Sequence, residues 1–172
     1  MGKVPEALNV THAEAVIDIH RQYIEAGADI IYANTFSANR YKLGYSDYSV
    51  EELVTAGVVN AKKAAAASER DVAVALDVGP IGELMEPNGS LKFEDAYDMF
   101  KEMMIVGAKA GADLIVIETS TDLLEMKAAV LAAKENTSLP VFSTMTFEKN
   151  GRTFTGVTVE AVIPCEEQAA RW

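Results

Sequence analysis

The stretch GADIIYANTF, residues 27–36, returns in altered form as GADLIVIETS, residues 111–120. Each copy holds a glycine that can stop a helix, an acidic turn residue and an apolar run that suits one buried strand. A polar side chain closes both runs at the matching place, Asn34 in the first copy and Glu118 in the second. The repetition indicates one structural unit, a helix end followed by a buried strand, used more than once.

The same pattern extends over most of the chain. Short and continuously apolar runs predict buried parallel strands at residues 29–34, 71–76, 113–117 and 140–146. Helical patterns precede or separate these runs and begin near Thr11, Ser49, Phe93 and Asp122. Two of these starts are predicted capping boxes, Thr11 with Glu14 and Ser49 with Glu52. Strict alternation of helices and strands forces parallel pairing, so the sequence predicts an α/β fold.

Length decides which α/β fold we expect. The unit is shared by (β/α)8 barrels and doubly wound sheets, and in both of them ligands bind beyond the carboxyl ends of the strands. A complete barrel of this type needs roughly 250 residues, whereas the chain has 172. We therefore expect a partial (β/α)8 TIM barrel with about four parallel strands. Its domain is expected to cover residues 1–160, followed by a polar tail at residues 161–172.

The amino-acid composition of the chain disfavours some classes of binding partner. Residues of hydrophobic type make up 49% of the chain, enough to bury a core, and the formal net charge is −11. An acidic surface disfavours nucleic acid and anionic membranes as partners. The only cysteine, Cys165, cannot form an internal disulfide, and the sequence begins without an apolar leader. We therefore expect a cytoplasmic protein.

Few residues stand out as carriers of chemistry. Glu118 would face the mouth of a barrel, where a carboxylate can hold a substrate amine or act as an acid or base. We favour this reading over the alternatives, a helix cap or an ion pair at the strand end. Asn34 and Thr35 could bind a polar ligand or serve as turn and cap groups. The histidines and Cys165 show no zinc-binding spacing, so we predict no metal site and assign no catalytic residue.

Four motifs in order resemble the homocysteine S-methyltransferase domain, which cobalamin-dependent methionine synthases carry at their amino terminus. They are EAGADIIYANTFSANRYKL at residues 25–43, GPIGELMEP at 79–87, AGADLIVIETSTDLLEMKAA at 110–129 and LPVFSTMTFEKNGRTFTG at 139–156. The likeness runs from about Leu8 to Glu160, and the bacterial methionine synthases are the nearest in character.

The resemblance implies a (β/α)8 barrel that binds homocysteine at the carboxyl ends of its strands. It implies that Glu118 lies near the amino group of homocysteine. It also implies that Asn34, Thr35 and Phe36 form the wall of the pocket and that Gly79 and Pro80 form its rim. The family activates the homocysteine thiol on a zinc ion held by three cysteines, but the sequence contexts of those ligands are missing here. Cobalamin and methyl-tetrahydrofolate would bind other domains of a full-length protein.

These observations predict methyl transfer to the thiol of homocysteine, giving methionine, with the chain incomplete and inactive by itself. The alternative is a noncatalytic α/β fragment that self-associates or binds a small molecule. A partial barrel leaves strand edges uncovered, so we expect a homodimer or the missing barrel half as the protein partner.

Overall fold

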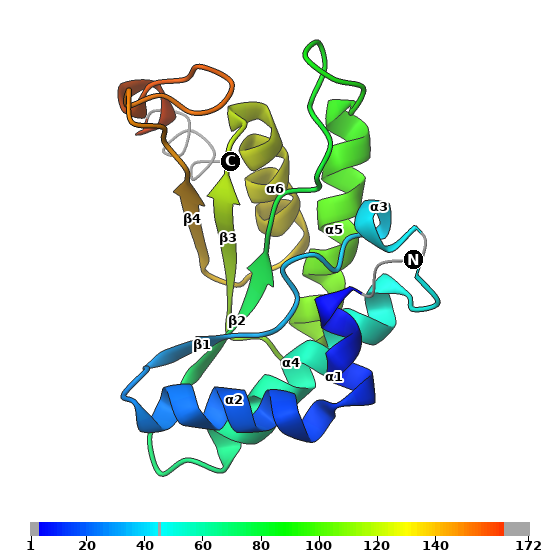
Figure 1. Cartoon of the computed structure of the whole chain (residues 1–172), viewed down its shortest axis with the longest axis vertical. Coiled ribbons are helices and arrows are strands. Elements are labelled where there is room, and N and C mark those ends of the chain that lie inside the picture. The colour runs from blue at the N-terminus through cyan, green and yellow to red at the C-terminus, as the bar shows by residue number, and fades with distance from the viewer. Residues whose placement is uncertain (1–3, 45, 164–172) are drawn as a thin grey trace.

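The computed structural model describes residues 4–44 and 46–163 (Figure 1). The elements in chain order are η1 Pro5–Ala7, α1 Leu8–Thr11, α2 Ala13–Glu25, β1 Ile30–Tyr32, α3 Arg40–Leu43, α4 Val50–Ala66, β2 Ala73–Val78, α5 Phe93–Ala110, β3 Leu114–Ser120, α6 Leu123–Asn136 and β4 Val141–Met145. No helix in this described part is long and apolar enough to cross a membrane.

The strands form one parallel sheet in the order β1-β2-β3-β4 (Figure 1). Ile31 lies opposite Val74, Leu76 opposite Ile115, and Val116 opposite Phe142. The α/β class and the four parallel strands with alternating helices are thereby confirmed. Since all strands run in the same direction, their carboxyl ends meet at a single edge, where ligands bind in such sheets.

Alternation along each strand gives the sheet two different faces. On one face, side chains such as Ile31, Leu76 and Ile115 belong to the main core with α4, α5 and α6. The opposite face carries a smaller cluster around Ala75 and Val116. Long crossover helices therefore cover one face only, and the polar residues near the strand ends lie on the other.

The helix starts predicted near Ser49 and Asp122 are confirmed, and both residues act as side-chain caps. The Ser49 side chain accepts a hydrogen bond from the Glu52 amide at 3.1 Å, and Asp122 accepts one from the Leu124 amide at 2.8 Å. Gly111 ends α5 in the left-handed region with φ 97°, which glycine adopts without the steric cost of a Cβ.

The capping box predicted at Thr11 is wrong. The helix breaks there, and α2 begins at Ala13 with His12 as its cap residue and no side-chain cap bond. The Thr11 hydroxyl instead donates to the Ala7 carbonyl at 3.0 Å within the preceding turn. Hydroxyl groups that bond back to the main chain in this way compete with capping, and the sequence pattern does not reveal which bond forms.

Helix α4 approaches the end of β1 closely at Gly57. A Cβ built at Gly57 would lie 2.8 Å from Asn9 Nδ2 and 2.8 Å from Thr35 Cγ2. The Asn9 amide fills this junction, where it donates to the Asn34 carbonyl at 2.7 Å and to the Leu53 carbonyl at 3.2 Å. A residue without a side chain is therefore required where α1, α4 and β1 meet.

Gly57→Ala tests this junction. At an open helix position alanine is more stable than glycine by about 1 kcal/mol, but here the added methyl group must displace Asn9 and Thr35. We expect the free energy of unfolding to fall by about 1–3 kcal/mol, the usual cost of overpacking, as measured by urea denaturation. Thr55→Ala, on the exposed face of the same helix, should change it by less than about 0.5 kcal/mol. A stabilised Gly57→Ala variant would contradict the packing.

Candidate functional site

The carboxyl ends of β1, β2 and β3 bring most of the predicted site residues to one edge of the sheet. Asn34 to Phe36 follow β1, Asp77 and Gly79 lie at the end of β2, and Glu118 lies near the end of β3. In the register of the sheet Asp77 is opposite Val116, so Glu118, two residues further on, is its diagonal neighbour on the same face. The predicted site residues on these three strands therefore lie at the same edge of the sheet.

Thr35 is fully buried and connects two strand ends. Its hydroxyl donates to the Asp77 carbonyl at 2.7 Å and accepts from the Asp77 amide at 3.1 Å. This exchange extends the pairing of β1 and β2 beyond the last residue of β1. The family resemblance implies that Thr35 lines the pocket wall, which stays a prediction. In the structure its hydroxyl bonds to the main chain of Asp77.

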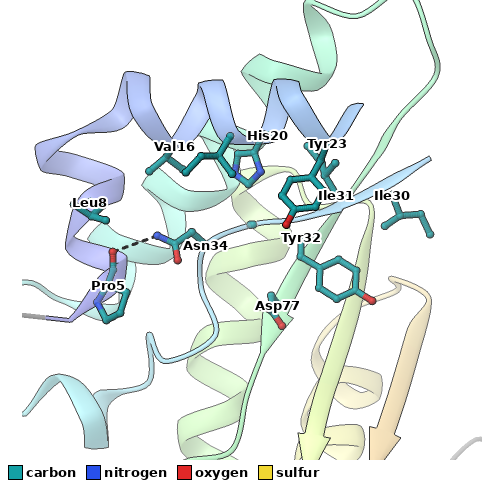
Figure 2. Close-up of a pocket in the computed structure, with 12 residues that line it drawn as sticks. Pro5, Leu8, Val16, His20, Tyr23, Ile30, Ile31, Tyr32, Asn34 and Asp77 are labelled. Atoms are coloured by element: carbon teal, nitrogen blue, oxygen red, sulfur yellow. Dashed lines mark hydrogen bonds between the residues drawn. The ribbon is translucent and has the colours of Figure 1, made fainter. Parts of the chain in front are cut away.

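Asn34 is half-buried and is also bound within the protein. Its side-chain amide donates to Asn9 Oδ1 at 3.0 Å and to the Pro5 carbonyl at 3.3 Å (Figure 2). These bonds attach the amino-terminal helical turns to the end of β1. Asn34 also lines the groove described below, and its role in binding a ligand stays a prediction.

Phe36 and Gly79 form a close contact on the predicted rim. The Gly79 amide donates to the Phe36 carbonyl at 3.0 Å, and a Cβ at Gly79 would lie 2.5 Å from Phe36 Cε2. The Lys42 ammonium lies 5.3 Å from the centre of the Phe36 ring, within the range of a cation–π interaction. Gly79 is therefore needed for the ring to lie against the main chain, and the neighbouring Pro80 is half-buried.

Glu118 lies where the pairing of β3 and β4 shifts register, between Ile117 and Ser120. The next residue, Thr119, has φ 58°, a conformation that is strained for a β-branched side chain. Irregularities of this kind redirect side chains and gather at functional sites. Glu118 itself is half-buried, and no hydrogen bond to its carboxylate is found within residues 4–44 and 46–163. Its carboxylate is available for a ligand.

Asp77 is the ionisable residue that the sequence analysis missed. It is 8% exposed, and its Oδ1 atom has no hydrogen-bond partner among the described residues. Burial, together with the nearby carboxylates of Glu118 and Glu6, raises the pKa of Asp77 to about 7. Like charges that share a poorly solvated site cannot all ionise at neutral pH. Asp77 and Glu118 therefore form a carboxylate pair that favours a cation.

Glu6 comes to this edge from the amino-terminal turn η1. It is 2% exposed, and its Oε1 atom accepts a hydrogen bond from the Ser37 amide at 2.6 Å. Nothing in the local sequence marks Glu6, because its position depends on a contact between segments about thirty residues apart. Asp77, by contrast, closes an apolar run as Asn34 and Glu118 do, so the same sequence signal could have found it.

A groove of about 530 Å³ begins beside this edge and runs along β1. Figure 2 shows Val16, His20 and Tyr23 of α2 on one side of the strand, with Tyr32 and Asp77 on the other. The walls are mainly apolar, and Asp77 is the acidic residue among those that line the groove. Of the carboxylate pair, Asp77 lines the groove and Glu118 does not.

The described residues do not provide the set of zinc ligands that the family resemblance implies. Within residues 4–44 and 46–163, no group of three histidine, cysteine, aspartate or glutamate side chains could hold a metal ion. Cys165 and most of the predicted tail at 161–172 lie outside the described part of the chain.

Asp77→Asn tests the carboxylate pair through stability. Because the folded pKa of about 7 exceeds the ordinary value of 3.8, the folded protein holds a proton that the unfolded chain releases. The contribution of Asp77 to stability is present below about pH 4 and is lost as pH rises to 7. At pH 8 the variant should be more stable than the parent by as much as about 4 kcal/mol. Urea denaturation between pH 4 and 8 measures this difference.

The control for this measurement is Asp71→Asn, an exposed position just before β2. It should leave both the free energy of unfolding and its pH dependence unchanged. An Asp77→Asn variant whose stability follows the same pH curve as the parent would show that Asp77 titrates normally, and the carboxylate pair would lose its physical basis.

Comparison with known proteins agrees with this architecture. The methionine synthases of Mycobacterium tuberculosis (strain ATCC 25618 / H37Rv) and Mycobacterium leprae (strain TN) are 32% and 31% identical to this chain. Each alignment covers 94% of this chain but only 14% of the relative. The chain therefore corresponds to a small part of those proteins.

Crystal structures of the homocysteine methyltransferase MmuM from Escherichia coli share the fold. The oxidized form has a TM-score of 0.85 at 18% identity, over 99% of this chain and 65% of that one; the metallated form has a TM-score of 0.81 at 17% identity. The sequence model of homocysteine S-methyltransferases matches residues 3–170, past the domain boundary predicted at residue 160, which stays a prediction. With nearly its whole length matched, this chain belongs to the homocysteine S-methyltransferase family.

Proposed function

We propose that this chain provides the homocysteine-binding edge of a methyltransferase of the methionine synthase type. The reaction would transfer a methyl group to the homocysteine thiol and give methionine. The observation that carries the proposal is the carboxylate pair, Asp77 and Glu118, at the carboxyl ends of adjacent parallel strands. Family membership supplies the substrate class.

The geometry suits the amino group of an amino acid. Glu118 is half-buried at the mouth and has no hydrogen-bond donor in the described part of the chain, so an incoming ammonium can bind it directly. Burial and the neighbouring carboxylates raise the pKa of Asp77 to about 7, and an ammonium group beside it would favour its ionised form. The pair thus offers charge-assisted hydrogen bonds that a neutral ligand cannot match.

The side chains around Asp77 and Glu118 suit the binding of a ligand rather than the making or breaking of its covalent bonds. The Phe36 ring lies against Gly79 and fixes the shape of the rim, while the Thr35 hydroxyl holds the main chain of Asp77 in place. We assign amino-group binding to Glu118 and Asp77, and shape to Phe36, Gly79 and Pro80. Activation of the thiol, the methyl donor and the cobalamin chemistry are assigned to other parts of a full-length protein.

Glu118→Gln tests the proposed role. Loss of a charge-assisted hydrogen bond costs about 1.5–3 kcal/mol, which corresponds to roughly ten- to a hundredfold in affinity. We expect the dissociation constant of L-homocysteine to rise by this factor in calorimetric titrations. Removing the amino group from the ligand, as in 4-sulfanylbutanoate, should weaken binding to the parent chain more than binding to the variant, in which only Asp77 of the pair remains charged.

The matched control is Glu69→Gln, an exposed residue that precedes β2 at the opposite edge of the sheet. It changes the net charge equally and should leave the affinity unchanged. If Glu118→Gln bound homocysteine as tightly as the parent, or if the parent did not discriminate between the two ligands, Glu118 would be a structural residue and the proposal would fail.

A further inference from the structure

Buried carboxylates hold the two loops that form the rim of the site. In the loop after β1, the carboxylate of Glu6 accepts a hydrogen bond from the Ser37 amide at 2.6 Å. In the loop after β2, the carboxylate of Glu125 in α6 accepts one from the Ile81 amide at 2.6 Å. The two acidic residues are 2% and 4% exposed. Each loop is therefore tied to the rest of the fold by an acidic group that is nearly excluded from solvent.

Lys42, in the short helix α3, is a cation that faces both of these carboxylates. Burial lowers the pKa of its ammonium group, and the negative charges of Glu6 and Glu125 oppose this shift. The ammonium group donates a hydrogen bond to Ser37 Oγ at 3.3 Å, so it lies beside the residue whose amide Glu6 holds. Buried carboxylates are costly without a counter-charge, and Lys42 supplies one.

The rest of the Lys42 side chain packs between the two loops. A Cβ built at Gly82, in the loop after β2, would lie 3.0 Å from Lys42 Cε. The ammonium group lies 5.3 Å from the centre of the Phe36 ring, in the loop after β1, and the same ring lies against Gly79. Lys42 therefore contacts both loops at the rim of the site.

The charges around Glu125 show the effect of this cation. Burial raises the pKa of the Glu125 carboxyl group, and Asp122 of the same helix adds to the shift. The hydrogen bond from the Ile81 amide and the positive charge of Lys42 act in the opposite direction. Without Lys42, an ionised Glu125 would face burial and a like charge with one amide as its support.

The other charged groups near the rim do not take the place of Lys42. Arg40, the second cation of α3, is exposed and pairs with Glu102 of α5 at 3.4 Å. Glu6 also faces the carboxylate pair at the strand ends, so that side adds negative charge only. The charge of Lys42 is therefore the counterpart of both carboxylates that hold the loops.

We propose that Lys42 is a positioning residue for the homocysteine site: its ammonium group balances the buried charges of Glu6 and Glu125, so that these carboxylates keep the two rim loops in place. The inference rests on the proposed function, because the rim formed by Phe36 and Gly79 is where homocysteine would bind. Lys42 acts through the loops and makes no contact with the ligand.

Lys42→Met tests this role in the 172-residue chain, because methionine keeps an unbranched side chain and removes the charge. At pH 7.5 the Ser37 and Ile81 amides of the ligand-free variant should exchange hydrogen roughly tenfold faster or more. The dissociation constant of L-homocysteine, measured by calorimetry, should rise by roughly tenfold or more, since breaking a buried ion pair leaves an uncompensated charge.

Glu125→Gln provides the rescue. Its side-chain oxygen can still accept the Ile81 amide, but it no longer needs a counter-charge. Added to Lys42→Met, it should slow the exchange of the Ile81 amide again and recover roughly fivefold or more of the lost affinity, a coupling that a double-mutant cycle measures. If Lys42 acted by packing alone, the two substitutions would be additive and no recovery would be seen.

The effect of Lys42→Met should also depend on pH. Because the pKa of Glu125 is already raised by burial, removing Lys42 raises it further, and a protonated carboxyl group needs no counter-charge. A raised pKa gives stability that is lost as pH rises through it. The ratio of the variant and parent dissociation constants should therefore be smaller at pH 5.5 than at pH 7.5, whereas a purely structural defect would leave it constant.

The matched control is Arg40→Met, which removes the same charge from the same helical turn at an exposed ion pair. It should change neither the exchange of the two amides nor the affinity. An unaltered Lys42→Met variant, an equal effect of Arg40→Met, or a defect that shows neither rescue nor pH dependence would overturn the proposal. So would a Lys42→Met variant that fails to fold by circular dichroism and is not restored by Glu125→Gln. A parent chain that does not bind homocysteine would refute the proposed function instead, and the two amides in the ligand-free protein would still decide whether Lys42 holds the loops.

Discussion

The hydrogen bonds between the Thr35 hydroxyl and the main chain of Asp77 are the constraint on which the site depends. The backbone hydrogen bonds between β1 and β2 stop after Ala33. The two bonds of the Thr35 hydroxyl, at 2.7 and 3.1 Å, keep the segments that follow β1 and β2 side by side for two more residues. They allow Phe36 to lie on Gly79, and they hold Asp77 beneath the strand end. The closeness of α4 at Gly57 protects this buried junction from water. The contact of Phe36 with Gly79, the position of Asp77 and the pairing of the strand ends therefore all depend on the Thr35 hydroxyl.

Much of this fold could be predicted from the residues alone, and the reasons are local. Ser49 and Asp122 accept hydrogen bonds from amides two or three residues ahead, and Gly111 adopts its left-handed turn at the end of its own helix. Continuous apolar runs marked the four strands, and the central strands β2 and β3 are buried along most of their length. The outer strands β1 and β4 were expected to be buried as well, but alternate side chains such as Tyr32 and Phe142 are exposed. Thr11 was misassigned because two local bonds compete for one hydroxyl.

The candidate site was less predictable because its properties arise between segments distant in the sequence. Glu118 and Asp77 become a pair only through the register of β2 and β3. Glu6, which lies near the start of the sequence, reaches the same edge through its contact with Ser37. The raised pKa of Asp77 follows from burial and from these neighbours, neither of which a single stretch of sequence contains. The residue type of Asn34 left open either ligand binding or a turn and cap role. Its side chain contacts Asn9 and Pro5, two distant residues that the local sequence does not reveal.

The protonation of Asp77 has a further consequence for any cation that arrives at this edge. Near neutral pH part of the population holds a proton on this carboxyl group, and a positively charged ligand expels it to solvent. Binding is then linked to proton release, so the apparent affinity increases with pH until Asp77 is fully ionised. The released proton is taken up by the buffer, and the heat measured on binding therefore includes the ionisation enthalpy of that buffer.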